Sequence, residues 1–158
     1  MSLTIELAKK SDIKDVFNLS NDFDVRANSF NIDKINWDDH VSWFENKIVS
    51  KDCVYFVVRN ELKEFVGQIR FDKIAEEENS YIISISLHRS FRGKGLGVSL
   101  LQDCSSKLLN DFGASKIYAY IQENNKSSLK VFDKTGYKFI GKKICNNIKF
   151  FKFEYCRN

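Results

Sequence analysis

The segment YIISISLHRSFRGKGLG, residues 81–97, constrains the fold more than any other part of the 158-residue chain. It opens with an apolar, β-branched run that is typical of a buried strand. The residues after Gly97, VSLLQDCSSKLLNDF, repeat leucines at a spacing that is typical of an amphipathic helix. Gly93, Gly95 and Gly97 therefore lie at a junction between a strand and a helix, where free backbone N–H groups and the helix dipole favour an anion.

Two common phosphate-binding motifs do not fit this glycine-rich loop. A dinucleotide fingerprint, GxGxxG, needs a glycine where the chain has Val98, and a Walker A loop needs Lys-Ser or Lys-Thr after its last glycine. What remains is the pattern RxxGxG from Arg92 to Gly97, in which the glycines allow a phosphate to approach the backbone. Taken alone, the loop leaves open whether it binds phosphate or is only a turn.

Composition narrows the classes of protein to which the chain can belong. A hydrophobic content of 43% predicts one domain with a real core, and we assign residues 1–158 to it. Because there is no long apolar run and no signal-peptide pattern, we expect a soluble, cytoplasmic protein without a membrane partner. The net charge of +4 is spread along the chain, which argues against nucleic acid but suits a small polyanionic ligand. The four cysteines lack CxxC spacing, so no metal site is predicted.

Periodicity predicts an α/β domain in which a mixed, mostly antiparallel sheet is flanked by helices. The helix expected from Trp37 to Lys51 places Val41, Phe44 and Ile48 on one face. Strands are expected at residues 3–7, 53–59, 64–72, 81–87, 116–121, 137–145 and 148–155, and further helices at 12–20, 98–112 and 125–134. We write the expected order of elements as βααββββαβαββ, which counts one strand more between the second and third helices than these ranges supply.

Two separate segments resemble one known family. LHRSFRGKGLG after an apolar strand is similar to the loop with which the GCN5-related N-acetyltransferases (GNAT) bind the pyrophosphate of acetyl-coenzyme A (acetyl-CoA). Further along, ENNKSSLKVFDKTGYKFIG resembles the family's closing segment, in which an asparagine opens a helix that ends in Lys-x-Gly-aromatic. The resemblance covers essentially the whole chain. It implies the GNAT fold, acetyl-CoA as co-substrate, and transfer of the acetyl group to a primary amine by direct attack on the thioester.

The resemblance also implies which residues bind the coenzyme. The pyrophosphate would be held by the backbone amides of Arg92, Gly93, Lys94, Gly95, Leu96 and Gly97. The exposed backbone at Leu87 would pair with the pantetheine arm as a β-strand does. Asn125, Ser128 and Phe132 would line the other side of the arm, although Asn125 also suits the N-cap of a helix.

The predicted reaction needs a base for the amine, donors for the developing oxyanion and a proton for the leaving thiolate. Many relatives carry a carboxylate on the strand before the loop, but YIISISL has none. Ser84 and Ser86 could hold a water that accepts the proton, since alternation places them opposite the strand's apolar side chains. His88 has a suitable pKa range but is expected to be exposed. A backbone N–H near Leu87 or His88 could meet the oxyanion.

One departure from the family concerns the proton for the thiolate. Phe132 stands where many relatives carry a tyrosine whose hydroxyl protonates the thiolate, and phenylalanine has no proton to give. Tyr137 is the nearest alternative, but its place at a strand start favours packing. Because a thiolate is a tolerable leaving group near neutral pH, we expect an active enzyme in which Phe132 is an apolar wall along the pantetheine arm.

The acceptor is predicted from the segment NDFDVRANSFNIDKINWDDHVSWF, whose first half is irregular and polar. Together with GQIRFD, it resembles the narrower GNAT branch that acetylates the 4-amino group of nucleotide-linked amino-deoxy sugars, as in pseudaminic acid biosynthesis. The candidate acceptor-binding residues are Arg26, Asn28, Phe30, His40, Trp43 and Arg70. The arginines suit phosphate groups, and the aromatic rings suit stacking.

Other interpretations of function stay open on the sequence alone. One is an acetyltransferase for a peptide or protein N-terminus or for a polyamine. A polyamine calls for an acidic cleft, for which DKIAEEENS is the only candidate. Another is a non-catalytic CoA-binding module, which the missing strand carboxylate and Phe132 allow. The sequence does not decide the general base, the general acid or whether the protein forms a homodimer.

Overall fold

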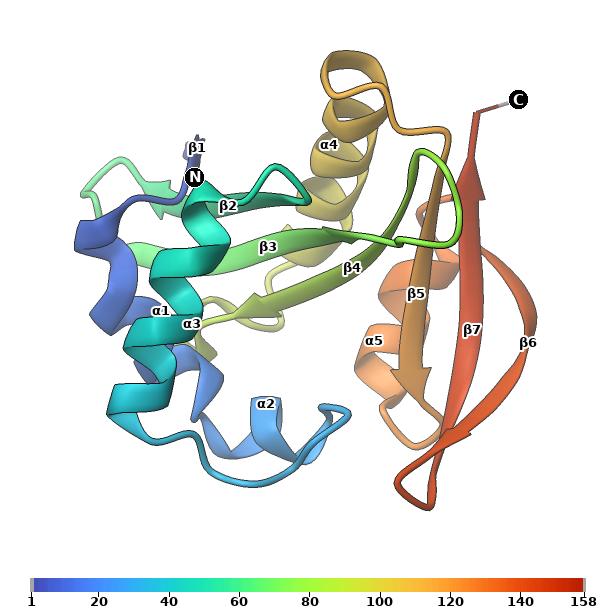
Figure 1. The fold of residues 1–158 in the computed structure, drawn as a ribbon, viewed down its shortest axis with the longest axis horizontal. Coiled ribbons are helices and arrows are strands. Elements are labelled where there is room, and N and C mark those ends of the chain that lie inside the picture. The colour runs from blue at the N-terminus through green and yellow to red at the C-terminus, as the bar shows by residue number, and fades with distance from the viewer. Residues whose placement is uncertain (1, 158) are drawn as a thin grey trace.

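A seven-stranded sheet organises residues 2–157, the part of the chain that the computed structural model describes (Figure 1). Its strand order is β1-β2-β3-β4-β5-β7-β6, and every neighbouring pair is antiparallel except β4 and β5. The strands are β1 Leu3–Leu7, β2 Cys53–Asn60, β3 Phe65–Lys73, β4 Ser80–Leu87, β5 Lys116–Gln122, β6 Lys138–Cys145 and β7 Ile148–Cys156. The sheet is therefore mixed and mostly antiparallel, as predicted.

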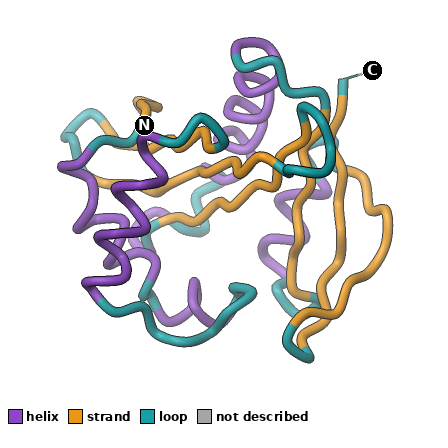
Figure 2. The backbone as a smooth tube through the Cα atoms, viewed as in Figure 1, coloured by secondary structure: helices purple, strands orange, loops and turns teal. Residues whose placement is uncertain are grey.

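Helices cover both faces of the sheet (Figures 1 and 2). They are α1 Ile13–Ser20, α2 Phe23–Ala27, α3 Trp37–Val49, α4 Leu96–Asp111 and α5 Lys126–Asp133. On the face that we call the α1/α3 face, Val16 and Phe44 pack against Tyr55 and Val57 of β2. On the α4/α5 face, a larger core joins buried side chains of α4 and α5 with those of β2, β3, β4 and β5. Within residues 2–157, none of the helices combines the length and apolar character that a membrane span requires.

The α/β fold class is confirmed, but the predicted order of elements differs in two places. Three strands rather than four lie between α3 and α4. The acidic stretch after β3 forms a loop of two successive turns, closed by a hydrogen bond from the N–H of Ile74 to the carbonyl of Ser80 at 2.9 Å. The short helix α2 interrupts the stretch predicted to be irregular. It forms there because the Asp22 carboxylate accepts hydrogen bonds from the N–H groups of Asp24 and Val25 at 3.1 and 3.2 Å.

The parallel contact between β4 and β5 is short. It joins Ser80–Ile82 to Lys116–Tyr118 through three residue pairs and then ends. β4 nevertheless continues to Leu87 and β5 to Gln122, and the two strands separate along this length, as Figure 1 shows. We call this separation, residues 83–87 of β4 facing 119–122 of β5, the divergence. It splits the sheet into two halves.

Phe132 of α5 leads to a prediction about stability. Its ring is 1% exposed and lies 5.0 and 6.2 Å from the rings of Tyr137 and Phe153, between centroids. Phe132→Ala should lower the free energy of unfolding by about 3–5 kcal/mol, because it removes buried area and leaves a cavity. Urea denaturation followed by circular dichroism measures the change, with Phe132→Leu as the milder control. An alanine variant of normal stability but reduced CoA affinity would instead place the ring beside the pantetheine arm.

Candidate active site

The edge of β4 in the divergence presents backbone groups that β5 does not pair. In an antiparallel ladder, alternate residues direct their N–H and C=O groups to the same neighbour. The N–H of His88 donates to the carbonyl of Val66 at 2.8 Å, and the register places Leu87 opposite Gly67. Even-numbered residues of β4 therefore bond to β3, whereas Ile85 and Leu87 direct their backbone groups into the divergence.

The sequence left open whether the N–H of Leu87 or that of His88 donates to the oxyanion, and this alternation decides between them. The N–H of His88 is already bonded to β3, so that half of the prediction is wrong, whereas the N–H of Leu87 faces the divergence. The carbonyl of Leu87 accepts a hydrogen bond from Nε of Arg92 at 2.9 Å. An extended ligand with amide groups can therefore pair with the N–H of Leu87 and with both backbone groups of Ile85, as an added strand would.

The glycine-rich loop at the end of β4 forms an open cradle of backbone amides. Gly93 and Gly95 have φ angles of +73° and +76°, in the left-handed region that glycine adopts without strain. Apart from chain neighbours, no heavy atom of residues 2–157 lies within 4 Å of where a Cβ would sit on either glycine. Gly95 directly precedes α4, and no side chain in the described part of the chain caps that helix. The loop therefore fits a diphosphate, which the free N–H groups of a helix N-terminus attract.

The side chain of Arg92 fastens this loop to α2. Its Nη atoms lie 3.0 Å from Asp22 and 3.2 Å from Asp24, and Arg89 lies 3.1 Å from Asp22. Burial raises the pKa of Asp22, but hydrogen bonds from Arg92 and Arg89 outweigh burial and lower that pKa to about 2. Asp22 therefore stays ionised, caps α2 and anchors it to the loop. This role of Asp22 was not predicted from the sequence, although an aspartate before a short helix is a capping signal.

The residues after α2 reach the other side of the divergence. Gln122, at the end of β5, donates from Nε2 to the carbonyl of Ala27 at 2.8 Å. The ring of Phe30 lies 5.7 Å from that of Tyr120 on β5, between centroids. Residues 22–30, which we call the strap, thus run from the glycine-rich loop to β5 across the end of the divergence (Figure 1). The strap links two halves of the sheet that do not pair there.

Polar side chains line the α1/α3 face beside the divergence. Ser84 and Ser86 lie on this face, on the side of β4 opposite its apolar residues, as predicted. Gln68 of β3 donates from Nε2 to the hydroxyl of Ser86 at 2.8 Å. The Oε1 atom of Gln68 is buried and has no hydrogen-bond partner within residues 2–157. A water between Gln68 and the serines would satisfy this atom, so the predicted water site fits here and stays a prediction.

Arg70 lies opposite Ser84 in the register and is held firmly on the same face. Its Nε donates to Asp72 at 2.8 Å, and its guanidinium carbon lies 4.9 and 5.8 Å from the ring centroids of Trp43 and Tyr55. Burial lowers the pKa of Arg70, but Asp72 and other neighbours raise it above its usual value, so the residue stays cationic. Burial raises the pKa of Tyr55, whose buried hydroxyl is unpaired among the described residues. A fixed cation beside a hydroxyl donor can bind an anion.

Both histidines have structural roles. His40, a predicted acceptor contact, is 1% exposed, and its Nε2 lies 2.9 Å from the carbonyl of Ile13. Its ring stacks on Phe44 with centroids 5.7 Å apart, so the predicted acceptor contact is wrong because the ring belongs to the core. His88, a predicted catalytic residue, is exposed and caps the short turn after β4 by accepting the N–H of Ser90 at 3.2 Å. Neither ring is positioned as a base.

Arg26 and Asn28, two predicted acceptor contacts, stabilise the strap. Arg26 donates to the carbonyl of Asp33 and to the hydroxyl of Ser29, both at 3.1 Å. Asn28 donates from Nδ2 to the carbonyl of Asp24 at 2.8 Å. Nε of Arg26 is buried without a partner among the described residues, but the hydrogen bonds that both side chains make lie within the strap and the segment after it, so we assign them to the strap and not to the acceptor. The predicted contacts that the structure brings to the acceptor face are Phe30, Trp43 and Arg70.

The predicted contacts on α5 divide between surface and core. Asn125 caps the helix by accepting the N–H of Ser128 at 3.4 Å, and both side chains are partly exposed. Their contact with the pantetheine arm stays a prediction. Phe132 is buried in the core, so its predicted place along the arm is wrong. Tyr137 is buried too, and its hydroxyl lies 2.8 Å from that of Ser105, which confirms the prediction that it packs.

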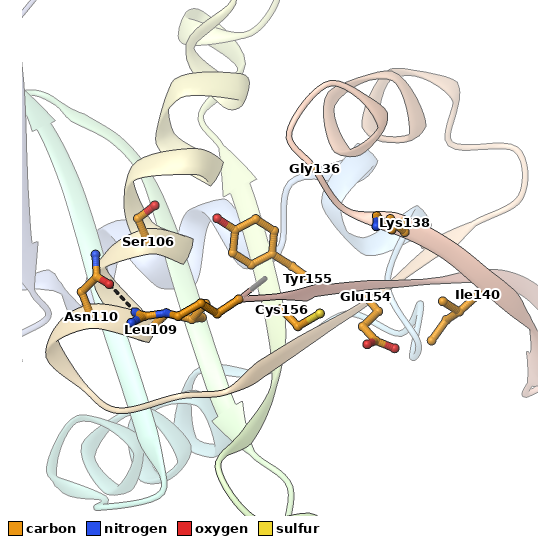
Figure 3. A pocket seen from close by; sticks show the side chains of 10 residues that line it. Ser106, Leu109, Asn110, Gly136, Lys138, Ile140, Glu154, Tyr155 and Cys156 are labelled. Carbon is orange, nitrogen blue, oxygen red and sulfur yellow. Dashed lines mark hydrogen bonds between the residues drawn. The ribbon is translucent and has the colours of Figure 1, made fainter.

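A hollow of about 510 Å³ lies away from these residues (Figure 3). Its lining includes Ser106 and Asn110 of α4 and Tyr155 of β7, and Asn110 is hydrogen-bonded to Arg157. The 16 residues of α4 span about 24 Å. Because the hollow lies at the C-terminal end of α4 and the glycine-rich loop at its N-terminal end, the hollow is not the cradle for the diphosphate.

Comparison with known proteins shows the family to which the chain belongs. Residues 2–138 match the acetyltransferase (GNAT) domain family. The chain belongs to the GNAT family. It is 27% identical over 145 residues to YwnH of Bacillus subtilis (strain 168), provisionally described as a phosphinothricin acetyltransferase, covering 85% of this chain and 83% of YwnH. This GNAT protein is an N-acetyltransferase that uses acetyl-CoA.

Solved structures agree with the fold of this GNAT protein. Spermidine N-acetyltransferase from Vibrio cholerae, in complex with CoA and spermine, superposes with a TM-score of 0.87 at 18% identity, covering 98% of this chain and 95% of that one. A crystal structure provisionally assigned as a phosphinothricin N-acetyltransferase superposes with a TM-score of 0.83 at 22% identity, covering 98% of both chains. At these identities the likeness supports the fold alone.

The cradle of this GNAT protein leads to a prediction about coenzyme affinity. Gly95→Val places a side chain where the diphosphate and the backbone meet, and should weaken CoA binding at least about tenfold, or about 1.4 kcal/mol. Gly113→Val is the matched control, because Gly113 follows the other end of α4, has a φ of +72° and is equally open. Both variants therefore carry the same backbone strain. Calorimetric titration with CoA that gives equal affinities for the two variants would remove the loop from the site.

Proposed function

We propose that the acceptor is the 4-amino group of a nucleotide-linked amino-deoxy sugar and that residues 1–158 act as one acetyltransferase domain. The observation that carries the proposal is Arg70, which is fixed by Asp72 and stacked on Trp43 one strand away from the divergence. The Nη atoms of Arg70 make no hydrogen bond within residues 2–157. A guanidinium with free donors beside an aromatic ring suits an anionic acceptor.

A polyamine is the second candidate acceptor, and the acidic residues that the sequence offered for it lie before β4, at the opposite end of this strand from the glycine-rich loop. Glu76, Glu77 and Glu78 lie in the turn before Ser80, so the length of β4 separates them from the glycine-rich loop. Eight residues of strand span about 26 Å. Glu77 also accepts a hydrogen bond from the hydroxyl of Tyr118 at 2.7 Å. The segment that was the only acidic candidate in the sequence is therefore far from the cradle.

In the proposed mechanism the unpaired edge of β4 binds the coenzyme, and its α1/α3 face binds the acceptor. When bound, acetyl-CoA supplies a thioester carbonyl for the amine to attack. The N–H and carbonyl groups of Ile85 hold the pantetheine arm, and the N–H of Leu87 donates to the thioester oxygen, which gains negative charge. On the α1/α3 face, Ser84 and Ser86 hold a water that passes the proton of the amine to solvent.

The leaving thiolate receives its proton from solvent in this proposal. Phe132 has no hydroxyl, and the hydroxyl of Tyr137 is buried against Ser105. A thiolate is stable enough near neutral pH to leave before it is protonated. A homodimer also stays a prediction, and the exposed side chains of Phe139 and Ile144 on the edge strand β6 support it.

The proposal is tested by a panel of amines with acetyl-CoA, in which the release of free thiol is followed. Nucleotide-linked amino sugars, spermidine and short peptides are compared. Arg70→Ala should raise the KM for a nucleotide-linked amino sugar at least about tenfold and leave that for acetyl-CoA nearly unchanged. Arg59→Ala is the matched control, because Arg59 is also ion-paired and lies 5.7 Å from the ring centroid of Phe65. Turnover of spermidine alone, or equal effects of the two variants, would contradict the proposal.

A further inference from the structure

A cationic strip on β6 and β7 continues the acceptor face beyond the divergence. Ile82 and Tyr118 are parallel partners and share a face, so Tyr120, two residues on, lies on the same face as Ser84. The ammonium nitrogen of Lys152 lies 4.3 and 5.6 Å from the ring centroids of Tyr118 and Tyr120. That of Lys143 lies 4.9 Å from the ring of Tyr120. Two cations therefore share one tyrosine ring at the edge of the divergence.

The charges of these two lysines are not balanced by nearby carboxylates. Among residues 2–157, neither Lys143 nor Lys152 forms an ion pair within 4.0 Å, whereas Lys116 lies 3.6 Å from Glu154 and 3.9 Å from Glu77. Glu154 and Glu77 are therefore engaged by Lys116, and Glu77 also by Tyr118. Two like charges held together without an acid create a positive potential that attracts an anion.

A hollow of about 390 Å³ adjoins this strip. It lies between the segment after the strap and the turn from β6 to β7, and its lining includes Phe30, Asn31, Asp33 and Asn146. Asn146 donates to the carbonyl of Phe30 at 3.1 Å, which holds the two segments together. The amide and carboxylate groups can bond to the edge of a nucleobase, and the ring of Phe30 can contact its face.

Phe30 connects the hollow to the lysines. Its ring lies 4.6 Å from that of Phe150 and 5.7 Å from that of Tyr120, between centroids. Phe150 is the register partner of Lys143, and Tyr120 lies under both lysines. The two lysines and the hollow therefore border the same ring, Tyr120, at the edge of the divergence. A nucleotide-linked sugar has three parts to place in these three neighbouring regions: a sugar, a diphosphate and a base.

We infer that Lys143 and Lys152 bind the diphosphate of a nucleotide-linked acceptor, that the hollow beside Phe30 holds its base, and that the amino sugar reaches the divergence beside Ser84. This subsite rests on the proposed function, because it assigns a place to each part of the proposed acceptor. It is separate from the glycine-rich loop, which faces the coenzyme.

The test is calorimetric titration of UDP, GDP and dTDP, used as probes, into protein saturated with CoA. Saturation fills the glycine-rich loop, so the probes report on the second site alone. Lys143→Gln and Lys152→Gln should each weaken probe binding at least about fivefold, because each removes one cation facing the diphosphate. Lys142→Gln is the matched control, since Lys142 is the adjacent residue on the opposite face, 5.5 Å from the ring centroid of Phe151, and it should change affinity less than twofold.

Comparison with the activity panel separates this subsite from the proposed function. If the probes bind in a way that depends on Lys143 and Lys152, but no nucleotide-linked sugar is acetylated, the result would support the subsite and contradict the proposed identity of the acceptor. Acetylation with a KM that neither lysine variant changes would support the acceptor and overturn the subsite. Failure of all three probes to bind, or equal losses in Lys142→Gln and Lys143→Gln, would also overturn the subsite. Thermal denaturation of each variant shows whether it remains folded.

Discussion

The short parallel contact between β4 and β5 is the constraint on which the rest of the site depends. Hydrogen bonding between the strands stops after Ile82 and Tyr118, and the backbone of Ile85 and Leu87 is left facing the divergence. An unpaired strand edge normally favours unwanted pairing with another chain. Here the edge is the surface on which an amide-bearing arm can pair as an additional strand. The glycine-rich loop begins where this edge ends, so the cradle for a diphosphate and the pairing edge form one continuous surface.

The two halves of the sheet are joined again by the strap. Asp22 is bonded to Arg92 beside the loop, and Gln122 holds the carbonyl of Ala27 at the end of β5. Since β4 and β5 do not pair at this level, these contacts fix how far apart the strands lie. The sheet itself separates two environments along β4. The α4/α5 face is apolar along β4, whereas the α1/α3 face presents serines, Gln68 and Arg70 to the same edge.

Features encoded by neighbouring residues could be predicted from the sequence, and features that depend on register or on distant partners could not. The strand, the glycines and the helix after them are local signals, and they gave the cradle and the family. The strap was missed because Asp22 lies in a polar run whose partner, Arg92, is far along the chain. His40 and Phe132 were assigned to ligands because a single residue in a helical pattern does not reveal whether it faces the core. The alternation of Ser84 and Ser86 was predicted correctly, but their neighbour Gln68 appears only once the register of β3 is known.

Amide hydrogen exchange followed by NMR, with and without CoA, tests most directly that the unpaired edge of β4 receives the coenzyme. The account predicts that CoA slows exchange at Leu87 and Ile85, whose N–H groups face the divergence, and at the amides of residues 93–97. Exchange at His88 should change little, because its N–H already donates to Val66. Saturating CoA that leaves exchange at Leu87 and Ile85 unchanged would contradict the account.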